Sequence, residues 1–372
     1  MTVTTAHLHF MTLALRLAAK GRGKTSPNPM VGALVVKNDR IVGRGYHQGP
    51  GQPHAEILAL KQAGPRAKGA ILYVTLEPCC HLLKRTPPCV PTVIHSGVRQ
   101  VVVAMADPNP SVKGRGIAAL RRAGITVTTA VAQEEAAQLN RAYLHWVTTG
   151  RPYVILKAGM TLDGKVATAK GESRWITGPR ARQDAHRLRG QVDAVAVGVG
   201  TVIHDDPTLT ARLSDRPLKL AARQPLRVVL DSRLRTPPTA TVCATQDRAK
   251  TLIVTTSRAS RSRFRPFELA GVEVVSLSLK NRRVSLPALM TMLGKRGITS
   301  VLLEGGSTVN AAALRAKLVN HVVLYLAPTL MGGQDAKAVI GDRSPQRLAQ
   351  ALTLRHLTVR RIGEDLVVEG DL

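Results

Sequence analysis

The residue types best suited to chemistry lie close together in the first quarter of the chain. His54 and Glu56 form a His-x-Glu motif, Cys79 follows a Glu-Pro pair, and Cys89 lies ten residues further on. A catalytic zinc ion takes three protein ligands and keeps a fourth position open for water. One imidazole and two thiolates would supply those ligands. Glu56 is placed to shuttle a proton between that water and a departing ammonia. The pattern therefore predicts a zinc-dependent deaminase site.

Each of these residues taken alone has a simpler explanation. His54 could be an ordinary polar residue at a helix start, and cysteine is often a small buried side chain. The ligand types occur together, however, in the order of the zinc deaminase signature. Three of the four cysteines also lie within eleven residues, and in a cytosolic enzyme such clustering indicates metal binding more than a disulfide framework.

The elements that must position these residues follow an α/β pattern. Residues 29–47 predict a β-hairpin that turns at Asn38 and Asp39. Beyond it, helices are predicted over 54–64, 87–97, 114–124 and 132–150, alternating with strands over 70–79, 100–108 and 125–131. This order predicts a three-layer α/β/α domain with helices around one sheet.

A second domain is expected after Gly150, where Arg151-Pro152 interrupts the pattern. A chain of 372 residues exceeds the roughly 250–300 residues at which a single core stops growing. We therefore expect domains at 1–150 and 151–372. Strands are predicted over 153–164, 193–202, 226–232, 251–257, 272–278, 300–306 and 321–328, and exposed loops over 211–226 and 258–266.

The composition of the chain indicates which classes of ligand it can bind. The net charge of +29 is spread along the chain, and only 3% of the residues are aromatic. A basic field attracts phosphorylated ligands and also nucleic acid, but few aromatic side chains are present for base stacking. We expect nucleic acid to bind only weakly and without specificity, with a non-enzymatic nucleic-acid-binding module as an alternative. No signal peptide and no long apolar run is recognisable, so we expect a cytoplasmic protein without membrane contact.

The spacing of the cysteines separates this chain from other deaminases. Nucleic-acid and nucleoside deaminases tend to carry Pro-Cys-x-x-Cys, whereas nine residues lie between Cys79 and Cys89. With its other motifs, the chain resembles the bifunctional riboflavin-biosynthesis family, in which a diaminohydroxyphosphoribosylaminopyrimidine deaminase is fused to a 5-amino-6-(5-phosphoribosylamino)uracil reductase. The matching segments cover essentially the whole chain and include SPNPMVGA, GYHQGPGQPHAE, YVTLEPCCH, TPPC, LKAGMTLDGKVA, ESRWIT, GVGTVIHDDPTLT and EGGST.

The resemblance implies a cytidine-deaminase-like α/β/α domain followed by a dihydrofolate-reductase-like α/β domain. It implies one Zn²⁺ per chain, NADPH, a phosphorylated pyrimidine substrate, and homo-oligomerisation through the reductase half. The implied first reaction is hydrolytic deamination of 2,5-diamino-6-(5-phosphoribosylamino)pyrimidin-4(3H)-one. Reduction of the ribosyl group to a ribityl chain would follow. A nucleoside or tRNA deaminase with an unrelated C-terminal domain is the alternative.

Carried over by motif, the zinc ligands are His54, Cys79 and Cys89, the proton shuttle is Glu56, and the pyrimidine nucleotide faces Asn28, His47 and His81. Cys79 is preferred to Cys80 as a ligand because it follows Glu-Pro directly, although Cys80 has the family's usual distance from Cys89. The loop between the cysteines carries one extra residue and lacks the family's glycine. Lys84 and Arg85 therefore both remain candidates for the basic substrate contact.

The second domain lacks a GxGxxG motif after its first strand, so a Rossmann cofactor site is not supported. Glycines between a strand and a helix at 304–308 would instead let backbone N–H groups approach a diphosphate. By resemblance, the NADPH contacts are Gly159, Trp175, Thr201, Asp205, Ser232, Gly306, Ser307 and Thr308. The substrate contacts are Ser173, Arg189, Leu209, Arg212 and Glu304.

Roles within the second domain follow from side-chain chemistry. Arg189 and Arg212 suit a phosphate ester because a guanidinium group offers it a bidentate fork. Lys157 and Glu304 are the candidates for protonating the reduced sugar, with a purely structural buried ion pair as the alternative. Trp175 has the alternative of being an ordinary core residue.

Overall fold

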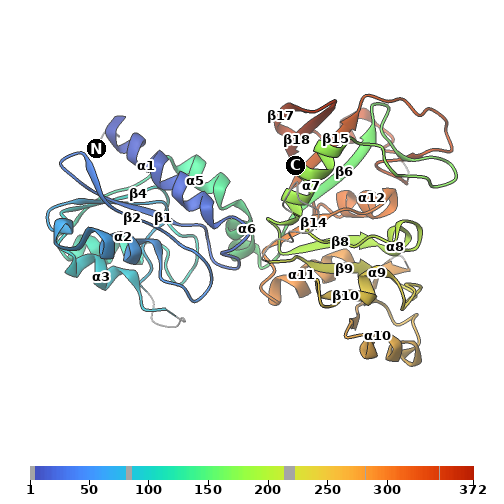
Figure 1. Cartoon of the computed structure of the whole chain (residues 1–372), viewed down its shortest axis with the longest axis horizontal. Coiled ribbons are helices and arrows are strands. Elements are labelled where there is room, and N and C mark those ends of the chain that lie inside the picture. Colours follow the sequence, from blue (N-terminus) through green and yellow to red (C-terminus); the bar gives the residue numbers. More distant parts are fainter. Residues whose placement is uncertain (1–4, 81–85, 213–222, 281, 343) are drawn as a thin grey trace. The chain divides into compact units, whose positions relative to one another are not determined.

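The computed structural model describes residues 5–80, 86–212, 223–280, 282–342 and 344–372. The chain forms two units, Met1–Gly150 and Arg151–Leu372 (Figure 1). Within the described ranges, every helix is too short or too polar to span a bilayer.

The N-terminal unit is built on a five-stranded sheet with the order β2-β1-β3-β4-β5. β1 runs antiparallel to both of its neighbours, whereas β3, β4 and β5 are parallel. The predicted hairpin is confirmed, and Asn38 and Asp39 in its turn both have positive φ. The strands are β1 (Gly32–Lys37), β2 (Arg40–Tyr46), β3 (Ile71–Val74), β4 (Gln100–Val103) and β5 (Thr126–Thr128). The helices are α1 (Thr5–Ala18), α2 (Ala55–Ala63), α3 (Cys89–His95), α4 (Arg115–Arg122), α5 (Gln133–Leu139) and α6 (Arg141–Thr149), with 3₁₀ turns at Ala19–Gly21 and Gly64–Ala67.

Alternation along β1 divides the core of this unit into two layers. Ala33 and Val35 pack with α2, α3 and α4, whereas Leu34 and Val36 pack with α1, α5 and α6. Successive side chains of a strand point to opposite faces, so one strand serves both layers. Figure 1 shows α1 and α5 on one side of the sheet and α2 and α3 on the other. The predicted three-layer α/β/α architecture is confirmed.

The single helix predicted over 132–150 is wrong. The chain forms α5 and α6 instead, with Asn140 between them at φ −102°. The side-chain amide of Asn140 accepts a hydrogen bond from the backbone N–H of Met30 at 2.8 Å and donates to the Met30 carbonyl oxygen at 3.0 Å. A contact with a residue 110 positions away thus fixes Asn140 where the helix breaks.

The C-terminal unit contains a nine-stranded sheet with the order β11-β10-β9-β8-β14-β6-β15-β18-β17. The strands from β11 to β15 are parallel, and β18 and β17 add an antiparallel edge. The sheet strands are β6 (Tyr153–Thr161), β8 (Ala194–Gly198), β9 (Leu226–Leu230), β10 (Thr251–Thr255), β11 (Glu273–Ser276), β14 (Ser300–Leu303), β15 (His321–Ala327), β17 (Arg355–Ile362) and β18 (Asp365–Asp371). Two small ribbons pair β7 (Lys165–Ala167) with β16 (Lys337–Ala338), and β12 (Leu279–Lys280) with β13 (Arg283–Val284). The helices are α7 (Pro179–Arg189), α8 (Val199–Asp205), α9 (Thr241–Ala244), α10 (Arg265–Leu269), α11 (Leu286–Lys295) and α12 (Ser307–Arg315), with 3₁₀ turns at Arg261–Arg263 and Leu348–Gln350.

Three details of the second unit differ from the sequence prediction. The strand predicted over 193–202 ends at Gly198, and α8 begins at Val199, so Gly200 lies in a helix rather than a strand. The stretch 258–266 contains a 3₁₀ turn and the start of α10 rather than only a loop. The hairpin β17–β18 was not predicted. Residues 213–222 of the other expected loop lie outside the described residues.

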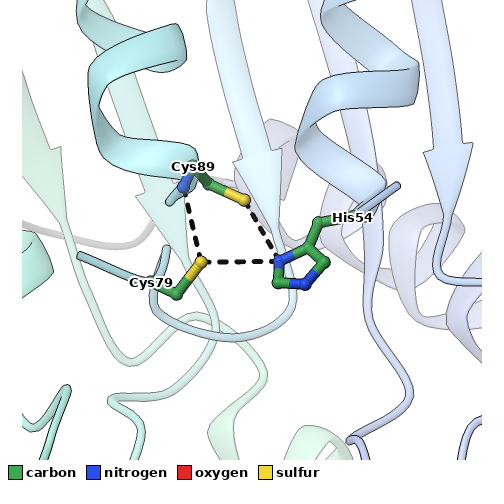
Figure 2. A group of neighbouring side chains, drawn as sticks. All are labelled: His54, Cys79 and Cys89. Carbon is green, nitrogen blue, oxygen red and sulfur yellow. Dashed lines mark hydrogen bonds between the residues drawn. The ribbon is translucent and has the colours of Figure 1, made fainter. Parts of the chain in front are cut away.

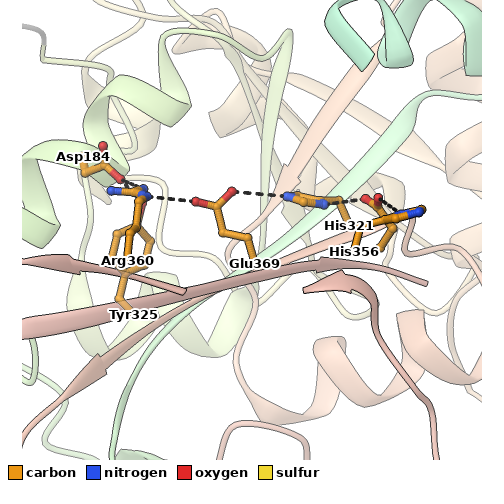
Figure 3. A network of polar contacts seen from close by, with 7 residues as sticks. Asp184, His321, Tyr325, His356, Arg360 and Glu369 are labelled. Atoms are coloured by element: carbon orange, nitrogen blue, oxygen red, sulfur yellow. Dashed lines mark hydrogen bonds and ion pairs between the residues drawn. The ribbon is translucent and has the colours of Figure 1, made fainter. Parts of the chain in front are cut away.

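A polar network fixes α7 on the sheet (Figure 3). The Asp184 carboxylate on α7 accepts hydrogen bonds from the Tyr325 hydroxyl at 2.9 Å and from Arg360 at 2.6 Å. Arg360 also donates to Glu369 at 3.2 Å. The contacts continue along β15, β18 and β17 through His321, Asp371 and His356. Because α7 also carries His186 and Arg189, this network positions the side chains that α7 directs at the cavity described below.

Candidate active sites

The three predicted zinc ligands come together beyond the carboxyl end of β3. Their ligand atoms all lie within 4.8 Å of one another. Nδ1 of His54 is 3.4 Å from the Cys79 sulfur and 3.2 Å from the Cys89 sulfur, and Figure 2 shows both sulfurs beside this one nitrogen. Tetrahedral zinc with ordinary bond lengths would hold a nitrogen and a sulfur roughly 3.6 Å apart. The donor set and its spacing therefore fit zinc, and the explanation as unrelated helix-start and core residues does not hold.

Local structure around the ligands explains how each is placed. His54 is the N-cap residue of α2, and its Nε2 lies 3.0 Å from the Thr86 hydroxyl, which leaves Nδ1 facing the sulfurs. A Cβ atom on Gly45 of β2 would lie 2.3 Å from the Ala55 carbonyl oxygen, so glycine lets α2 approach the sheet. Cys89 begins α3, and its backbone N–H donates to the Cys79 carbonyl at 3.0 Å.

Glu77 is a positioning residue to which the sequence prediction gave no role. Its buried carboxylate accepts hydrogen bonds from the backbone N–H groups of Asp107, Gly114 and Ile117 at 3.0–3.2 Å. A Cβ atom on Gly116 would lie 2.1 Å from the Pro78 carbonyl oxygen. The Glu-Pro pair that precedes Cys79 is thus fixed against the start of α4. A carboxylate directly before a predicted ligand is the sequence signal that could have indicated this.

The predicted proton shuttle and two predicted substrate contacts lie beside the ligands. Glu56, in the first turn of α2, is only 3% exposed. Burial and then the charge of Cys79 raise the pKa of Glu56, although the charge of His54 and a hydrogen bond with Cys89 oppose them. Asn28 Nδ2 donates to His47 Nε2 at 3.0 Å, and the rings of His47 and His54 are 5.3 Å apart. Burial lowers the pKa of His47. The predicted residues His81, Lys84 and Arg85 lie outside the described residues.

The choice between Cys79 and Cys80 gives a direct test. Cys79 belongs to the ligand cluster of the described residues, and Cys80 does not. We expect Cys79→Ser to lose most of the bound zinc, because a serine hydroxyl is a far poorer ligand than a thiolate. The neighbouring Cys80→Ser should retain one zinc per chain. Plasma mass spectrometry of the dialysed proteins measures both, and the reverse pattern would make Cys80 the ligand.

The candidate residues of the second unit line one cavity of about 1790 Å³ along the carboxyl edge of the parallel strands. Ligand sites in open α/β sheets lie at this edge. The structure brings all fourteen predicted positions to this cavity, namely Lys157, Gly159, Ser173, Trp175, Arg189, Thr201, Asp205, Leu209, Arg212, Ser232, Glu304, Gly306, Ser307 and Thr308.

A bidentate ion pair dominates the inner wall of the cavity. Arg189 donates to both carboxylate oxygens of Glu304, at 2.8 Å and 2.6 Å. Burial alone would raise the pKa of Glu304, but Arg189 and Lys157 outweigh it and hold the pKa at about 2. The Arg189 guanidinium group, which the sequence analysis assigned to a phosphate ester, is thus bound to Glu304. Glu304 is ionised near neutral pH and carries no proton to donate.

His186, which was not predicted, links the Thr210 backbone to the predicted substrate contact Arg212. Its Nδ1 lies 3.1 Å from the Thr210 carbonyl oxygen, and its Nε2 lies 2.9 Å from Arg212. Burial and the nearby Arg189 and Arg212 lower the pKa of His186 to about 4. The ring is therefore neutral at pH 7, and its Nε2 can accept a hydrogen bond that orients Arg212.

Cofactor candidates occupy the rest of the wall. Trp175 is 69% exposed, so the alternative of a core residue is wrong, and Arg182 lies 4.6 Å from its ring centre. Ser173, a predicted substrate contact, donates to the predicted cofactor contact Asp205 at 2.9 Å. A Cβ atom on Gly306, the N-cap of α12, would meet no atom within 4 Å. A ligand can thus approach the bare backbone at a helix start, as a diphosphate requires.

Zinc deaminases combine a three-ligand zinc site with a carboxylate beside it, and dinucleotides bind at the carboxyl ends of parallel strands. By fold and site, the chain thus joins a zinc-dependent deaminase to a dinucleotide-dependent reductase.

Comparisons with known proteins agree with this class. Residues 4–105 match the family model described as the cytidine and deoxycytidylate deaminase zinc-binding region, and residues 152–368 match the RibD C-terminal domain. The riboflavin biosynthesis protein RibD of Actinobacillus pleuropneumoniae is 43% identical over 98% of this chain and 95% of its own length. RibD of Escherichia coli is 42% identical over 96% of this chain and 97% of its own length. This chain belongs to the RibD family and combines a deaminase with an NADPH-dependent reductase.

Solved structures support the same assignment over the whole chain. Acinetobacter baumannii RibD, form 2, superimposes with a TM-score of 0.88 at 39% identity and covers 99% of both chains. A diaminohydroxyphosphoribosylaminopyrimidine deaminase/5-amino-6-(5-phosphoribosylamino)uracil reductase from Thermotoga maritima gives a TM-score of 0.84 at 34% identity over 98% of both chains. The cytidine-deaminase-like and dihydrofolate-reductase-like folds are confirmed. The match of residues 152–368 also counts against a nucleoside or tRNA deaminase with an unrelated C-terminal domain.

Proposed function

We propose that the N-terminal unit deaminates 2,5-diamino-6-(5-phosphoribosylamino)pyrimidin-4(3H)-one to 5-amino-6-(5-phosphoribosylamino)uracil. The C-terminal unit then reduces the ribosyl group of that product to a ribityl chain. The observation that carries the proposal is the presence of both sites in one chain: the His54, Cys79 and Cys89 cluster and the Glu304 cavity. Likeness to the bifunctional Thermotoga maritima enzyme supports the choice of substrate.

In the deaminase unit, His54, Cys79 and Cys89 would hold the zinc ion. A bound zinc ion would supply a Lewis acid that lowers the pKa of the attacking water. Glu56 takes a proton from the attacking water and delivers it to the amino nitrogen that leaves as ammonia. Its burial excludes bulk water from this transfer.

Asn28 and His47 are proposed to face the pyrimidine. His47 Nδ1 lies 3.3 Å from the Pro53 carbonyl and donates to it, so Nε2 accepts from the Asn28 amide. His47 therefore orients Asn28, whose side-chain oxygen can accept a hydrogen bond from an amino group of the substrate.

In the reductase unit, we assign protonation of the sugar to Lys157. Bound NADPH supplies the hydride. Glu304 is ionised and paired with Arg189, so it fixes the wall of the cavity instead of donating a proton. Burial lowers the pKa of Lys157, which makes its ammonium group a better proton donor near neutral pH. Arg212, held by His186, is the contact we assign to the substrate phosphate.

A coupled assay tests the proposal. The protein is incubated with the diaminopyrimidine ribosyl phosphate and NADPH while absorbance at 340 nm and released ammonia are recorded. We expect both signals to stop after zinc is removed with a chelator, because the reductase then lacks its substrate. Supplying the deaminated intermediate should restore NADPH oxidation in the chelated protein. Equal NADPH oxidation from the diamino substrate with and without zinc would contradict the proposed order.

We further propose that the chain is a cytoplasmic homo-oligomer that associates through its reductase unit. Leu357 and Val359 on β17 and Leu366 on β18 are exposed apolar side chains. Pairing of Val359 with Val368, and of Arg361 with Leu366, places these apolar residues on one face of the sheet. An exposed apolar face of this kind supports a protein partner. Light scattering that gives the mass of a single chain would exclude the oligomer.

A further inference from the structure

One end of the reductase cavity carries a concentration of positive charge. Three segments contribute to it: the one after β9, the one after β10, and the β12–β13 ribbon. Six exposed basic side chains line this end, namely Arg233, Arg235, Arg258, Lys280, Arg282 and Arg283. Three separate parts of the chain thus bring cations to one place, and such a cluster attracts an anion of high charge.

The protein does not neutralise these cations itself. In the part of the chain that the structure describes, none of the six forms an ion pair with a carboxylate. The adjacent Asp231 is engaged by the backbone N–H and hydroxyl of Thr236, at 2.6 Å and 2.8 Å. Asp206 is engaged in the same way by Thr241. The charge therefore remains available to a ligand.

The order of the strands gives the position of this cationic end relative to Lys157, Glu304 and the glycines at the helix starts. Lys157 lies on β6 and Glu304 follows β14, which is adjacent to β6. The glycines at the starts of α8 and α12 follow the neighbouring strands β8 and β14. The cations follow β9 and β10, which lie beyond β8. From β6 to β9 is three strand spacings, roughly 14 Å. Lys157, the glycines at the two helix starts and the cationic end thus succeed one another along a single edge of the sheet.

Two hydrogen bonds fix the cationic end around Ser232. The Val284 backbone N–H donates to the Ser232 hydroxyl at 3.0 Å, and the Thr256 hydroxyl donates to the Ser232 carbonyl at 2.7 Å. Arg283 directly precedes Val284, and Arg258 lies two residues after Thr256. These two arginines therefore flank Ser232 from different segments.

We propose that Arg258 and Arg283 bind the phosphate on the 2′ oxygen of the cofactor's adenosine ribose and so make the chain prefer NADPH to NADH. The inference rests on the proposed reductase function. A dinucleotide whose nicotinamide lies near Lys157 and whose diphosphate lies at Gly306 extends its adenosine toward β9 and β10. The two guanidinium groups then meet the dianionic group that distinguishes the two cofactors.

The substrate also carries a phosphate monoester, which the same cations would attract. The substrate phosphate is assigned instead to Arg212, which contacts His186 of α7 and is not one of the six cations of this end. Ribose phosphate binding at Arg258 and Arg283 would affect the Michaelis constant of the pyrimidine substrate. Binding of the 2′-phosphate would affect only NADPH.

The experiment measures cofactor dissociation constants of the full chain by isothermal titration calorimetry. NADPH and NADH are titrated into the unaltered protein, Arg258→Gln, Arg283→Gln, the double variant and Arg248→Gln. Arg248 is an exposed control outside the cavity. We expect each single variant to weaken NADPH binding about 10-fold and the double variant roughly 100-fold, with NADH binding unchanged. The control should bind both cofactors as the unaltered protein does.

Three results would overturn the inference. NADPH affinity could stay unchanged in the double variant, or NADPH and NADH could weaken equally, or only the Michaelis constant of the pyrimidine substrate could rise. Titration with 2′,5′-ADP and 5′-AMP repeats the comparison without the nicotinamide. Failure of the reductase assignment would give a different result, because the unaltered protein would then bind neither NADPH nor NADH.

Discussion

Glu56→Gln should lower ammonia release by roughly a factor of 10³ while hydride transfer to the deaminated intermediate continues. Glutamine keeps the size and hydrogen-bonding shape of glutamate but cannot accept and return a proton. General acid–base catalysis contributes about 10²–10⁴ to a rate. Glu56 is buried, so bulk water cannot readily replace it. The measurement is ammonia release from the diaminopyrimidine ribosyl phosphate, with NADPH oxidation from the intermediate followed in parallel.

The control variant is Glu135→Gln, an exposed carboxylate on α5 of the same unit, which should deaminate normally. Zinc content is measured in both variants. Full deamination by Glu56→Gln would remove this residue from the mechanism. Loss of zinc together with activity would instead make Glu56 a support of the metal site.

The zinc cluster could be predicted because local signals mark each ligand. His54 precedes a helix, Cys89 begins another, and Cys79 follows a Glu-Pro pair at the end of a strand. Side chains at helix starts and strand ends gather at one edge of an α/β sheet. Residue type, order and spacing were therefore sufficient to predict which side chains meet.

Contacts between segments that are far apart in the sequence could not be predicted from local sequence patterns. Arg189 and Glu304 are 115 positions apart, and nothing local in either segment indicates that the two form an ion pair. Asn140 breaks a helix because of Met30, 110 positions away. The β17–β18 hairpin was missed for a different reason: only Leu357 and Val359 alternate with polar residues, and seven of the eight residues of β17 are exposed, so the pattern of a half-buried strand is weak. The Arg189–Glu304 ion pair and the helix break at Asn140 depend on tertiary contacts rather than on local sequence propensity.

Lys157→Met should lower hydride transfer by a factor of about 10²–10³ and leave ammonia release unchanged. Methionine preserves much of the lysine side chain's apolar length but cannot protonate the reduced sugar. Lys157 lines the cavity near the Tyr325 ring, 5.5 Å from its centre, which a thioether can also contact. Stopped-flow absorbance at 340 nm measures the rate. A variant with the full rate would mean that the proton comes from water or another group.

The pH dependence of Glu304→Gln tests the same assignment from the neighbouring side chain. Hydride transfer requires protonated Lys157, so the rate should fall as pH rises through the pKa of Lys157. Burial lowers that pKa, and the Glu304 carboxylate opposes the effect. Removing the carboxylate should therefore lower the pKa further and move the alkaline limb of the rate profile to lower pH. An unchanged alkaline limb in Glu304→Gln would show that Lys157 is not the titrating donor.

The same substitution should also destabilise the reductase unit, because it leaves the Arg189 charge buried without its partner. Loss of one member of a buried pair costs roughly 3–5 kcal/mol. Glu273 and Arg296 form a bidentate pair of similar geometry, at 2.7 Å and 2.8 Å, but in an exposed position. Glu273→Gln is therefore the matched control and should cost less than about 1 kcal/mol. Urea unfolding of both variants measures the difference, and equal losses would show that Glu304 is not held in a desolvated pair.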